Sequence, residues 1–389
     1  MKFLVLGSGL MGPAAAYIGM QADDVSAVTL ADRSAEQLAT AQKRLTGLPG
    51  LEKVAFAQID LADRDPAIAL FARHDVVLAA LPSEIIPLGM RTAIAARRPL
   101  VDLSTPPAGE MAALEAEAAQ AGAFLLRGCG VEPGLTEIWA RHLAEELESI
   151  DSLHIKCGGI PAAPTPPLGY KIVFGGRRLP LRAIDGHAVE AGALVQVARY
   201  SDAEPVTFDG VGEVEAWHEN FMPWLLELES LKGLGEGSQK TIRWPGYAAK
   251  VTLLKELGLL SSQPIDIDGA SIAPKHFLDV LLYPKVRFDE TDRDITLVRL
   301  DAEGTKDGKA TRLSVEMIDR YDEALGFTSM ARTTAMTGAI IARMVGRGEI
   351  SGRGLLTPEK VVTGPHFERL MGELAAIGVI FTQSVHTPA

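Results

Sequence analysis

The sequence contains little cysteine, few aromatic residues and no excess of positive charge. Its 389 residues include only 2 cysteines, Cys129 and Cys157, which are too few for a disulfide framework and lack the paired spacing of a metal site. We therefore expect no metal and a reducing, cytoplasmic location. The formal net charge of −12 would repel a phosphate backbone, and no cluster of Lys and Arg offsets it, so nucleic acid is not an expected partner.

Long apolar runs are also missing. No run approaches the ~18 to 20 apolar residues of a membrane span, so no membrane association is expected. Gly7, Gly9, Gly12 and Gly19 interrupt the first apolar stretch, which argues against a secretory signal. What is present is an ordinary globular composition, with 47% apolar and 23% charged residues. Because single cores rarely grow beyond ~250 residues, this length predicts two domains.

Residues 2–126 alternate short apolar runs with amphipathic segments. Strands are predicted at 2–6, 26–31, 54–59, 75–80, 99–102 and 124–126. Ser34 and Gln37 form a capping box that opens one of the helices between them. This alternation predicts a parallel sheet, and runs that are apolar throughout, such as 76–80, predict helices on both of its faces. The predicted fold class is α/β, a doubly wound Rossmann sheet followed by a second, α+β domain.

The pattern changes after Arg127, where a Gly- and Pro-rich stretch begins. Beyond it the segments are strand-like and irregular, and two helices are predicted near the C-terminus, at 332–345 and 367–378. A loop is predicted at 304–309. The predicted domains are 1–127 for NAD(P) binding, 128–334 for the substrate, and 335–389 as C-terminal helices that pack back on the Rossmann domain.

The strongest motif is Gly7-Ser8-Gly9-Leu10-Met11-Gly12, which follows a strand and opens a helix. Gly7 permits a tight turn, Gly9 allows a diphosphate to approach the backbone, and Gly12 allows close packing of helix and sheet. The helix N-terminus offers N–H groups and partial positive charge to the phosphates. The motif therefore predicts a dinucleotide site. Flavin proteins share such a fingerprint, but the further motifs of flavin binding are not found.

An acidic residue, Asp32, ends the next strand, 25 residues after Gly7. Its carboxylate should accept hydrogen bonds from the adenosine ribose and repel a 2′-phosphate, which favours NAD as cofactor. Arg33 follows immediately and could instead pair with that phosphate, which leaves NADP open. Asp60, at the end of the third strand, could approach the adenine or be an ordinary loop acid.

The reactive end of the cofactor is expected outside the carboxyl ends of the later strands. The residues selected there as cofactor contacts are Pro82, Ser83 and Ser104. Oxidation by hydride transfer commonly requires a base near the nicotinamide, and Asp102 and Glu132 are the candidates. Each has a structural alternative, because Asp102 could only orient a loop and Glu132 could only brace the turn before Pro133.

The sequence resembles that of the saccharopine dehydrogenase-like family, and within it most closely that of bacterial and archaeal lysine 6-dehydrogenases. The blocks that carry the resemblance are 4–12 with Asp32, 101–103, 130–135, 158–161, 166–168 with Tyr170, 240–243 with Gly246, 330–334 and 346–348. The resemblance spans nearly the whole chain. It implies a homodimer, a second domain with a mixed sheet that also forms the dimer contact, and NAD-linked oxidation of an amine-bearing carbon of an amino acid.

The resemblance also implies residues for the substrate. Arg243 and Lys240 suit a cationic clamp for the carboxylate of an amino acid, and Tyr170 belongs to a matching block. Where lysine dehydrogenases have small residues, this chain has the bulky stretch 216–222, in which His218 could be a base, a substrate contact or a structural residue. Oxidation of a saccharopine-like secondary amine and a non-catalytic NAD-binding module are the alternative functions.

Overall fold

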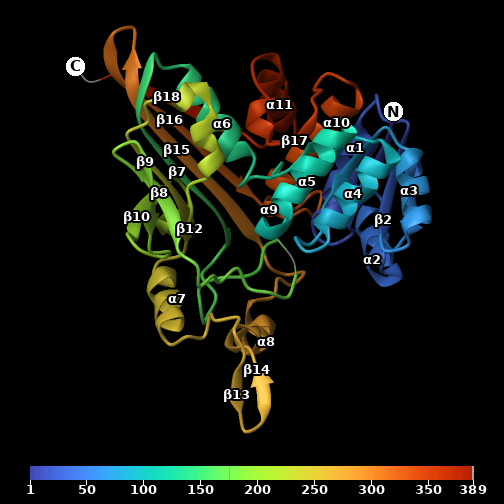
Figure 1. Ribbon diagram of the computed structural model, residues 1–389, viewed down its shortest axis with the longest axis horizontal. Coiled ribbons are helices and arrows are strands. Elements are labelled where there is room, and N and C mark those ends of the chain that lie inside the picture. The colour runs from blue at the N-terminus through green and yellow to red at the C-terminus, as the bar shows by residue number, and fades with distance from the viewer. Residues whose placement is uncertain (175, 388–389) are drawn as a thin grey trace. The chain divides into compact units, whose positions relative to one another are not determined.

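The computed structural model describes residues 1–174 and 176–387, which form two compact units (Figure 1). Unit 1 comprises Met1–Trp139 and Asp322–Ile380, and unit 2 comprises Ala140–Tyr321 and the chain from Phe381 onward. The division differs from the predicted boundaries at residues 127 and 334. The Gly- and Pro-rich stretch and the segment before the penultimate helix both belong to unit 1.

Unit 1 is built on a seven-stranded sheet in the order β17-β6-β5-β4-β1-β2-β3. The strands are β1 (Lys2–Leu6), β2 (Ala27–Asp32), β3 (Val54–Gln58), β4 (Val76–Ala79), β5 (Leu100–Asp102), β6 (Phe124–Leu126) and β17 (Gly354–Leu356). Every pairing is parallel, so the predicted Rossmann fold is confirmed. The strand order reverses between β1 and β4, which is where such sheets bind ligands.

The helices of unit 1 pack on this sheet. They are α1 (Gly12–Gln21), α2 (Ala35–Leu45), α3 (Arg64–Ala72), α4 (Ile86–Ala96), α5 (Ala108–Ala121), α9 (Ser329–Ala331), α10 (Thr337–Gly346) and α11 (Pro365–Ala376), with α6 (Leu135–Glu145) crossing into unit 2. Short 3-10 turns lie at Leu51–Lys53 and Pro358–Lys360, and a π-helical turn at Arg332–Met336 precedes α10. Residues of β1, β4, α3, α4 and α5 share one buried apolar cluster.

Helix α10 lies close to the sheet because small residues line it. A Cβ added at Gly338 would stand 2.2 Å from a methyl group of Leu103, just after β5, and 3.0 Å from the carbonyl oxygen of Cys129. Glycine is therefore required there by the close approach of helix and loop. The contact brings the C-terminal part of the chain against the ends of β5 and β6.

Unit 2 is built on a nine-stranded sheet whose main order is β10-β11-β12-β7-β15-β16-β18. The strands are β7 (Ser149–Pro161), β8 (Gly186–Glu190), β9 (Ala193–Val197), β10 (Glu204–Phe208), β11 (Gly212–His218), β12 (Glu236–Arg243), β15 (Asp294–Lys306), β16 (Lys309–Arg320) and β18 (Phe381–His386). Strands β12 and β7 pair in parallel and the remaining pairs are antiparallel, so the sheet is mixed, as the resemblance implies.

The loop predicted at 304–309 is instead the end of a long hairpin. Asp307 and Gly308 alone form the turn, and both have positive φ values, 51° and 68°. Two consecutive left-handed residues match the right-handed twist of the flanking strands. The prediction was wrong because the glycines and lysines of this stretch resemble an open loop.

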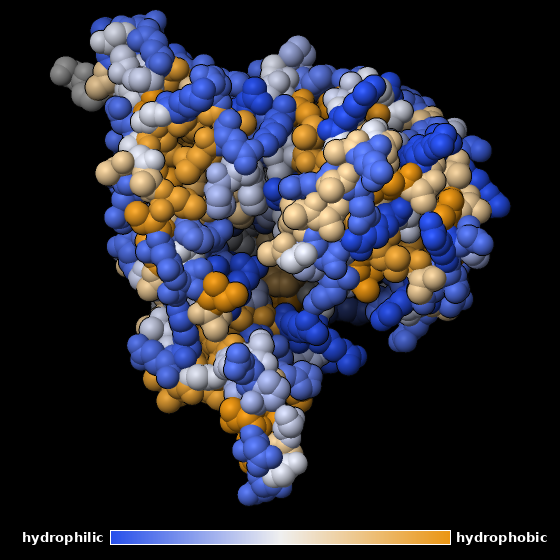
Figure 2. Space-filling model, viewed as in Figure 1, coloured by the Kyte–Doolittle hydropathy of each residue, from blue (hydrophilic) through white to orange (hydrophobic). Residues whose placement is uncertain are grey.

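Two helices and a small hairpin extend from the sheet of unit 2. These are α7 (Tyr247–Glu256), α8 (Pro274–Val286), β13 (Ile265–Ile267) and β14 (Ala270–Ile272), with 3-10 turns at Pro223–Glu227 and Glu229–Leu231. Apolar side chains of the hairpin and α8, including Ile265, Phe277 and Val280, are at least half exposed (Figure 2). Across the described residues, no helix has the length and apolar character needed to cross a membrane.

Candidate functional site

In the glycine loop of unit 1, close packing within the protein accounts for two of the three glycines but not for the third. A Cβ at Gly7 would lie 2.4 Å from the Ala80 carbonyl oxygen, and a Cβ at Gly12 would lie 1.8 Å from that of Gly7. A Cβ at Gly9, in contrast, would meet no atom within 4 Å. Gly7 and Gly12 are thus required by the fold, whereas Gly9 leaves open space. That space fits the approach of a diphosphate to the main chain.

The N-terminus of α1 is also suited to an anion. Its first turn has no acidic residue and no capping side chain, so the helix's own side chains do not neutralise the amides there. Pro13 occupies the first turn and removes one donor, as the sequence indicates. The remaining N–H groups and the helix dipole favour a phosphate at this position. Leu10 and Met11 lie half-buried between the loop and the helix.

Asp32 holds the glycine loop in place. Its Oδ2 accepts hydrogen bonds from the Ser8 backbone N at 2.7 Å and the Ser8 hydroxyl at 2.9 Å. Its Oδ1 accepts from the backbone N of Ser34 at 2.9 Å. A carboxylate offers about four lone-pair positions, so roughly one remains for a ribose hydroxyl. Asp32 is therefore mainly a brace for the loop, which sequence reasoning did not foresee.

Arg33, next to this brace, is exposed, and no hydrogen bond or ion pair of its guanidinium is found in the described part of the chain. A guanidinium at the end of the second strand is well suited to bind a 2′-phosphate. Asp60 uses its Oδ1 to accept from the Ala62 backbone N at 2.9 Å, which is the ordinary role of a loop acid. The residues around the adenosine end thus fit NADP better than the sequence pattern suggested.

The loops after β4 and β5 meet at the carboxyl edge of the sheet. The Ser83 hydroxyl donates to the carbonyl oxygen of Thr105 at 3.1 Å, and the backbone N of Ser104 donates to Asp102 at 2.8 Å. Pro82 is exposed beside them. The predicted cofactor contacts Pro82, Ser83 and Ser104 therefore lie on connected loops beside the strand-order reversal.

Asp102 is fully buried, at 0% exposure. Its Oδ1 holds the Ser104 amide, whereas its Oδ2 has no hydrogen-bond partner. Burial raises the pKa of this carboxyl well above its usual value, with the Ser104 hydrogen bond opposing the rise. Burial disfavours the charged form that a base needs, so the site favours the structural alternative in which Asp102 orients the loop after β5.

Glu132, the second candidate base, lies half-buried in the loop that follows β6. This loop is fixed to the end of β5, because the Cys129 backbone N donates to the Asp102 carbonyl oxygen at 2.8 Å. Its turn is closed by a bond of 2.9 Å from the Gly130 N to the Pro133 carbonyl oxygen. Glu132 is therefore the predicted base that a substrate could reach, on a rigid support.

The three candidate site residues of β11 and β12, His218, Lys240 and Arg243, do not share one face of the unit 2 sheet. His218 pairs directly with Lys240, and Trp217 pairs with Thr241. Side chains alternate along a strand, so Arg243 lies on the face of Thr241 and Trp217, and Lys240 lies on the opposite face with His218. Lys240 therefore cannot form a single clamp with Arg243, contrary to the prediction.

The ammonium of Lys240 takes part in an ion-pair network on the face of the sheet opposite to Arg243. Its ammonium donates to the carbonyl oxygen of Asp202 at 2.9 Å, to the carboxylate of Asp202 at 2.6 Å and to that of Glu204 at 2.9 Å. An ammonium has three donors, so none is left for a substrate. His218 lies 3.4 Å from Asp202 in the same cluster, and burial followed by the Lys240 charge lowers its pKa. Both residues fit a structural role.

Arg243 lies in an aromatic environment and has no carboxylate partner among the residues that the structure describes. Its guanidinium carbon is 4.7 Å from the centre of the Tyr170 ring and 5.7 Å from that of Tyr247. One terminal nitrogen donates to the Ile242 carbonyl oxygen at 2.7 Å, whereas Nε is buried without a partner. Glu215, opposite Arg243 on β11, instead accepts from backbone amides at the start of α7. The result is a cation that is 9% exposed and that no carboxylate in residues 1–174 or 176–387 neutralises.

Tyr170 supports the same environment. It is 0% exposed, and its hydroxyl makes no hydrogen bond of ordinary geometry. Burial raises the pKa of this hydroxyl, and the nearby charge of Arg243 opposes that rise. A carboxylate arriving beside Arg243 would find positive charge and hydroxyl donors in a region of low dielectric, where such interactions are strongest. Tyr170 and Arg243 are thus brought together as predicted substrate residues.

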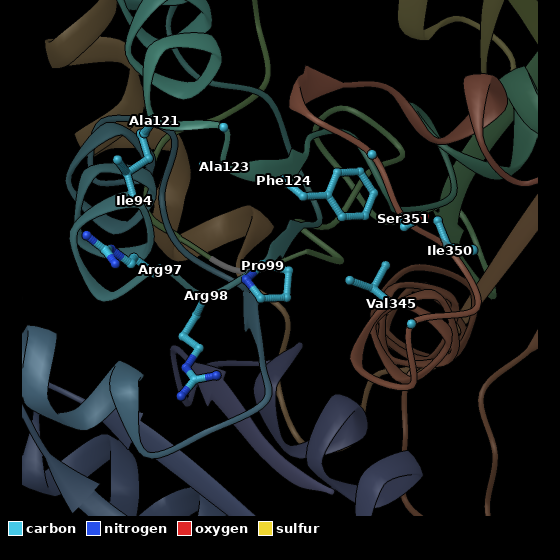
Figure 3. Close-up of a pocket in the computed structure, with 13 residues that line it drawn as sticks. Ile94, Arg97, Arg98, Pro99, Ala121, Ala123, Phe124, Val345, Ile350 and Ser351 are labelled. Carbon is cyan, nitrogen blue, oxygen red and sulfur yellow. The ribbon is translucent and has the colours of Figure 1, made fainter.

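A pocket of about 430 Å³ in unit 1 lies elsewhere (Figure 3). It is bordered by Pro99 and Ala123, which precede β5 and β6, so it opens at the amino ends of the parallel strands. Figure 3 shows Phe124 and Val345 facing the pocket and Arg98 running away from them. Nucleotides bind at the opposite, carboxyl edge of such sheets. Within residues 1–174 and 176–387, no group of His, Cys, Asp or Glu is arranged to hold a metal ion.

Comparison with known proteins assigns the chain to a family. Residues 3–126 match the saccharopine dehydrogenase NADP binding domain, and residues 130–379 match the saccharopine dehydrogenase C-terminal domain. The chain belongs to the saccharopine dehydrogenase family. It is therefore a nicotinamide-dependent oxidoreductase, and the predicted dinucleotide-binding domain is confirmed.

Several known proteins are similar to this chain over nearly its whole length. Saccharopine dehydrogenase [NADP(+), L-glutamate-forming] of Schizosaccharomyces pombe is 24% identical over 96% of this chain and 97% of its own length. Carboxyaminopropylagmatine dehydrogenase of a Synechocystis species is 20% identical, with 96% of both chains covered. The apo structure of saccharopine dehydrogenase (L-Glu forming) from Saccharomyces cerevisiae matches with a TM-score of 0.79, 21% identity and 99% coverage of each chain, which shows a common fold.

Proposed function

We propose that this protein oxidises a secondary amine that carries a carboxylate group, with NADP⁺ as the electron acceptor. One observation carries the proposal: Arg243 is a buried cation for which the described part of the chain provides no carboxylate. An uncompensated buried charge is costly, so such groups are normally paired. A substrate carboxylate is the partner that fits, and the amino-acid-derived substrates named for the relatives support this choice.

The choice of cofactor rests on unit 1. Arg33 offers a guanidinium to a 2′-phosphate, and most of the Asp32 lone pairs are already used by the loop, so its repulsion of that phosphate is reduced. The match of residues 3–126 to an NADP binding domain supports the same choice. We expect NADP⁺ to be preferred and NAD⁺ to be accepted. The bound nicotinamide supplies a two-electron acceptor.

The chain's own residues provide binding and proton transfer. Arg243 and Tyr170 hold the carboxylate, and Glu132 removes the proton from the amine nitrogen as the carbon–nitrogen bond is oxidised to an imine. Water then adds to the imine, and the adduct separates into a carbonyl compound and a primary amine. Asp102 takes no proton in this scheme and keeps the loop after β5 in place.

Lysine 6-dehydrogenase activity, which the sequence predicts, is the second candidate function. Lysine also has a carboxylate for Arg243, but its oxidised amine is primary. The secondary amine is preferred because the names of several relatives refer to saccharopine or to a carboxyaminopropyl compound. A homodimer, implied by the family resemblance, is part of the same proposal and is tested by gel filtration with light scattering.

A small substrate panel tests the proposal. Purified protein is incubated with NADP⁺ or NAD⁺ and with saccharopine, lysine or cadaverine, the last being lysine without its carboxylate, and absorbance is followed at ~340 nm. We expect reduction with saccharopine and NADP⁺ and little or none with cadaverine. Tight NADP⁺ binding without reduction by any amine would favour the alternative of a non-catalytic module.

A further inference from the structure

We infer that the indole N–H of Trp217 is a second donor to the substrate carboxylate, beside Arg243. The inference deepens the proposed function and rests on it for the identity of the substrate. It assigns a role in substrate specificity to Trp217. The sequence pattern did not indicate this residue, since its neighbour His218 has the more reactive side chain.

The register of β11 and β12 places Trp217 on the same face of the unit 2 sheet as Arg243. Trp217 pairs with Thr241, and Thr241 is two residues from Arg243 on β12. Residues in this diagonal relation have Cα atoms about 7 to 8 Å apart, which large side chains can span. Figure 1 shows β12 ending beside α7, the helix that begins with Tyr247. Trp217 and Arg243 therefore converge on the region in front of Tyr247.

Aromatic contacts fix the orientation of Trp217. Its ring is nearly parallel to that of Tyr247, with an angle of 8° between the planes and 6.0 Å between the centroids. The centroid of the Tyr200 ring lies 4.7 Å from that of the indole. The Arg243 guanidinium also lies against Tyr247. Trp217 and Arg243 thus both lie beside the ring of Tyr247, and these contacts restrict the movement of both side chains. A rigid pair loses little conformational entropy when a ligand binds.

The hydrogen bonds of this cluster are incomplete. Trp217 is 2% exposed, yet its Nε1 has no hydrogen-bond partner in the described part of the chain, and the same holds for Nε of Arg243. Buried donors are nearly always satisfied, and each one left without a partner costs about 1 to 3 kcal/mol. Both atoms are donors that cannot accept. An acceptor with negative charge, such as a carboxylate, would satisfy both together.

This arrangement has a consequence for substrate choice. A carboxylate has two oxygens, so it can accept from Trp217 and from Arg243 simultaneously. A neutral amide presents one acceptor oxygen and an NH₂ group, and the latter would face a donor. The site should therefore reject amides by more than the loss of charge alone, because one donor would be left unsatisfied.

The indole N–H groups can be observed directly by NMR. The chain has 4 tryptophans, so a spectrum of protein labelled with ¹⁵N shows few indole signals, and Trp217→Phe identifies the relevant one. We expect saturating saccharopine to move the Trp217 signal downfield. Trp244 is the internal control, because its indole N–H already donates to the Pro161 carbonyl oxygen at 2.8 Å. Its signal should remain in place.

Kinetics provide the second readout. Trp217→Phe keeps an aromatic ring and removes the N–H, so the KM for saccharopine should rise about tenfold while kcat stays within about twofold. Trp244→Phe should leave both values unchanged. Thermal unfolding of both variants verifies that each is folded.

Two results would overturn the inference. A Trp217 signal that saccharopine and lysine leave unmoved, or move no more than that of Trp244, shows that the indole does not bind the substrate. An unchanged KM in folded Trp217→Phe shows the same. A moved signal without reduction of NADP⁺ would instead support the inference and contradict the proposed enzymatic activity.

Discussion

Trp217 and Arg243 lie on the same face of the unit 2 sheet, whereas His218 faces the other side, directly opposite Lys240. Neighbours in the sequence therefore belong to different environments. On one face a cation is surrounded by tyrosines and lacks an acid, and on the other a lysine is neutralised by Asp202 and Glu204. The first arrangement suits a ligand and the second suits the fold.

Gly9→Ala should separate cofactor binding from folding. A Cβ at Gly9 meets no protein atom within 4 Å, so the melting temperature should change by less than about 2 °C, while NADP⁺ affinity should fall at least tenfold. Gly12→Ala is the matched contrast, since its Cβ would lie 1.8 Å from the Gly7 carbonyl oxygen and should destabilise the fold itself. Calorimetric titration and thermal unfolding measure the two effects. Unchanged NADP⁺ affinity in Gly9→Ala would remove the diphosphate from this loop.

Arg33→Ala should change cofactor preference. Loss of a guanidinium that binds a 2′-phosphate costs about 1.5 to 3 kcal/mol, so the KM for NADP⁺ should rise at least tenfold. The KM for NAD⁺, which lacks that phosphate, should be nearly constant. Steady-state kinetics with both cofactors provide the comparison. Equal losses for the two cofactors would show that Arg33 acts through the fold of the loop.

Glu132→Gln should reduce turnover and leave binding intact. The amide keeps the size of the side chain but cannot take a proton, so kcat should fall by about 10² to 10⁴. NADP⁺ affinity should be unchanged, because the loop is held by backbone bonds to the end of β5. Asp102→Asn is the comparison, and it should lower thermal stability more than kcat. If Asp102→Asn instead abolishes turnover in a folded protein, the base has been assigned to the wrong acid.

Stability should depend on pH through Glu359, in the 3-10 turn after β17. Burial raises the pKa of this carboxyl to about 7, the Thr357 hydrogen bond opposes the rise, and the charge of Glu137 adds to it. Because the pKa is higher in the folded state, the folded protein binds more protons, and stability decreases as pH rises from about 4.5 to 7. The loss is about 2 to 3 kcal/mol.

Glu359→Gln should remove most of this pH dependence. Its free energy of unfolding should exceed that of the parent at pH ~8 and approach it at pH ~5, as measured by denaturant titration at each pH. Glu349→Gln is a suitable control, since Arg347 lowers the pKa of that acid and the expected dependence has the opposite sign. A parent whose stability is constant across this range would contradict the assignment.

The fold of unit 1 could be predicted because its signals are local. Residues 76–80 are apolar throughout, the glycine loop lies between a strand and a helix, and both features are properties of short windows. Strand β17 could not be predicted, because three residues carry no period and it joins the sheet from a distant part of the chain. The helix pattern at 332–345 gave no sign of the π-helical turn within it.

The site of unit 2 was harder to predict, for a reason that lies in the register of β11 and β12. Which residue of β11 shares a face with Arg243 depends on the pairing of the two strands, and a shift of one residue would exchange Trp217 and His218. One signal was available in the sequence. Lys240 and Arg243 are three residues apart, an odd spacing that places them on opposite faces of any strand.

The most direct test of the central claim compares parent protein with Arg243→Gln, using NADP⁺ with saccharopine and with cadaverine. Loss of the charge-assisted hydrogen bonds, about 1.5 to 3 kcal/mol, should raise the KM for saccharopine by about 10- to 100-fold and leave the weak reaction of cadaverine unchanged. His218→Gln, on the opposite face, should behave as the parent does. An Arg243→Gln enzyme that is folded and has the parent's KM for saccharopine would contradict the account.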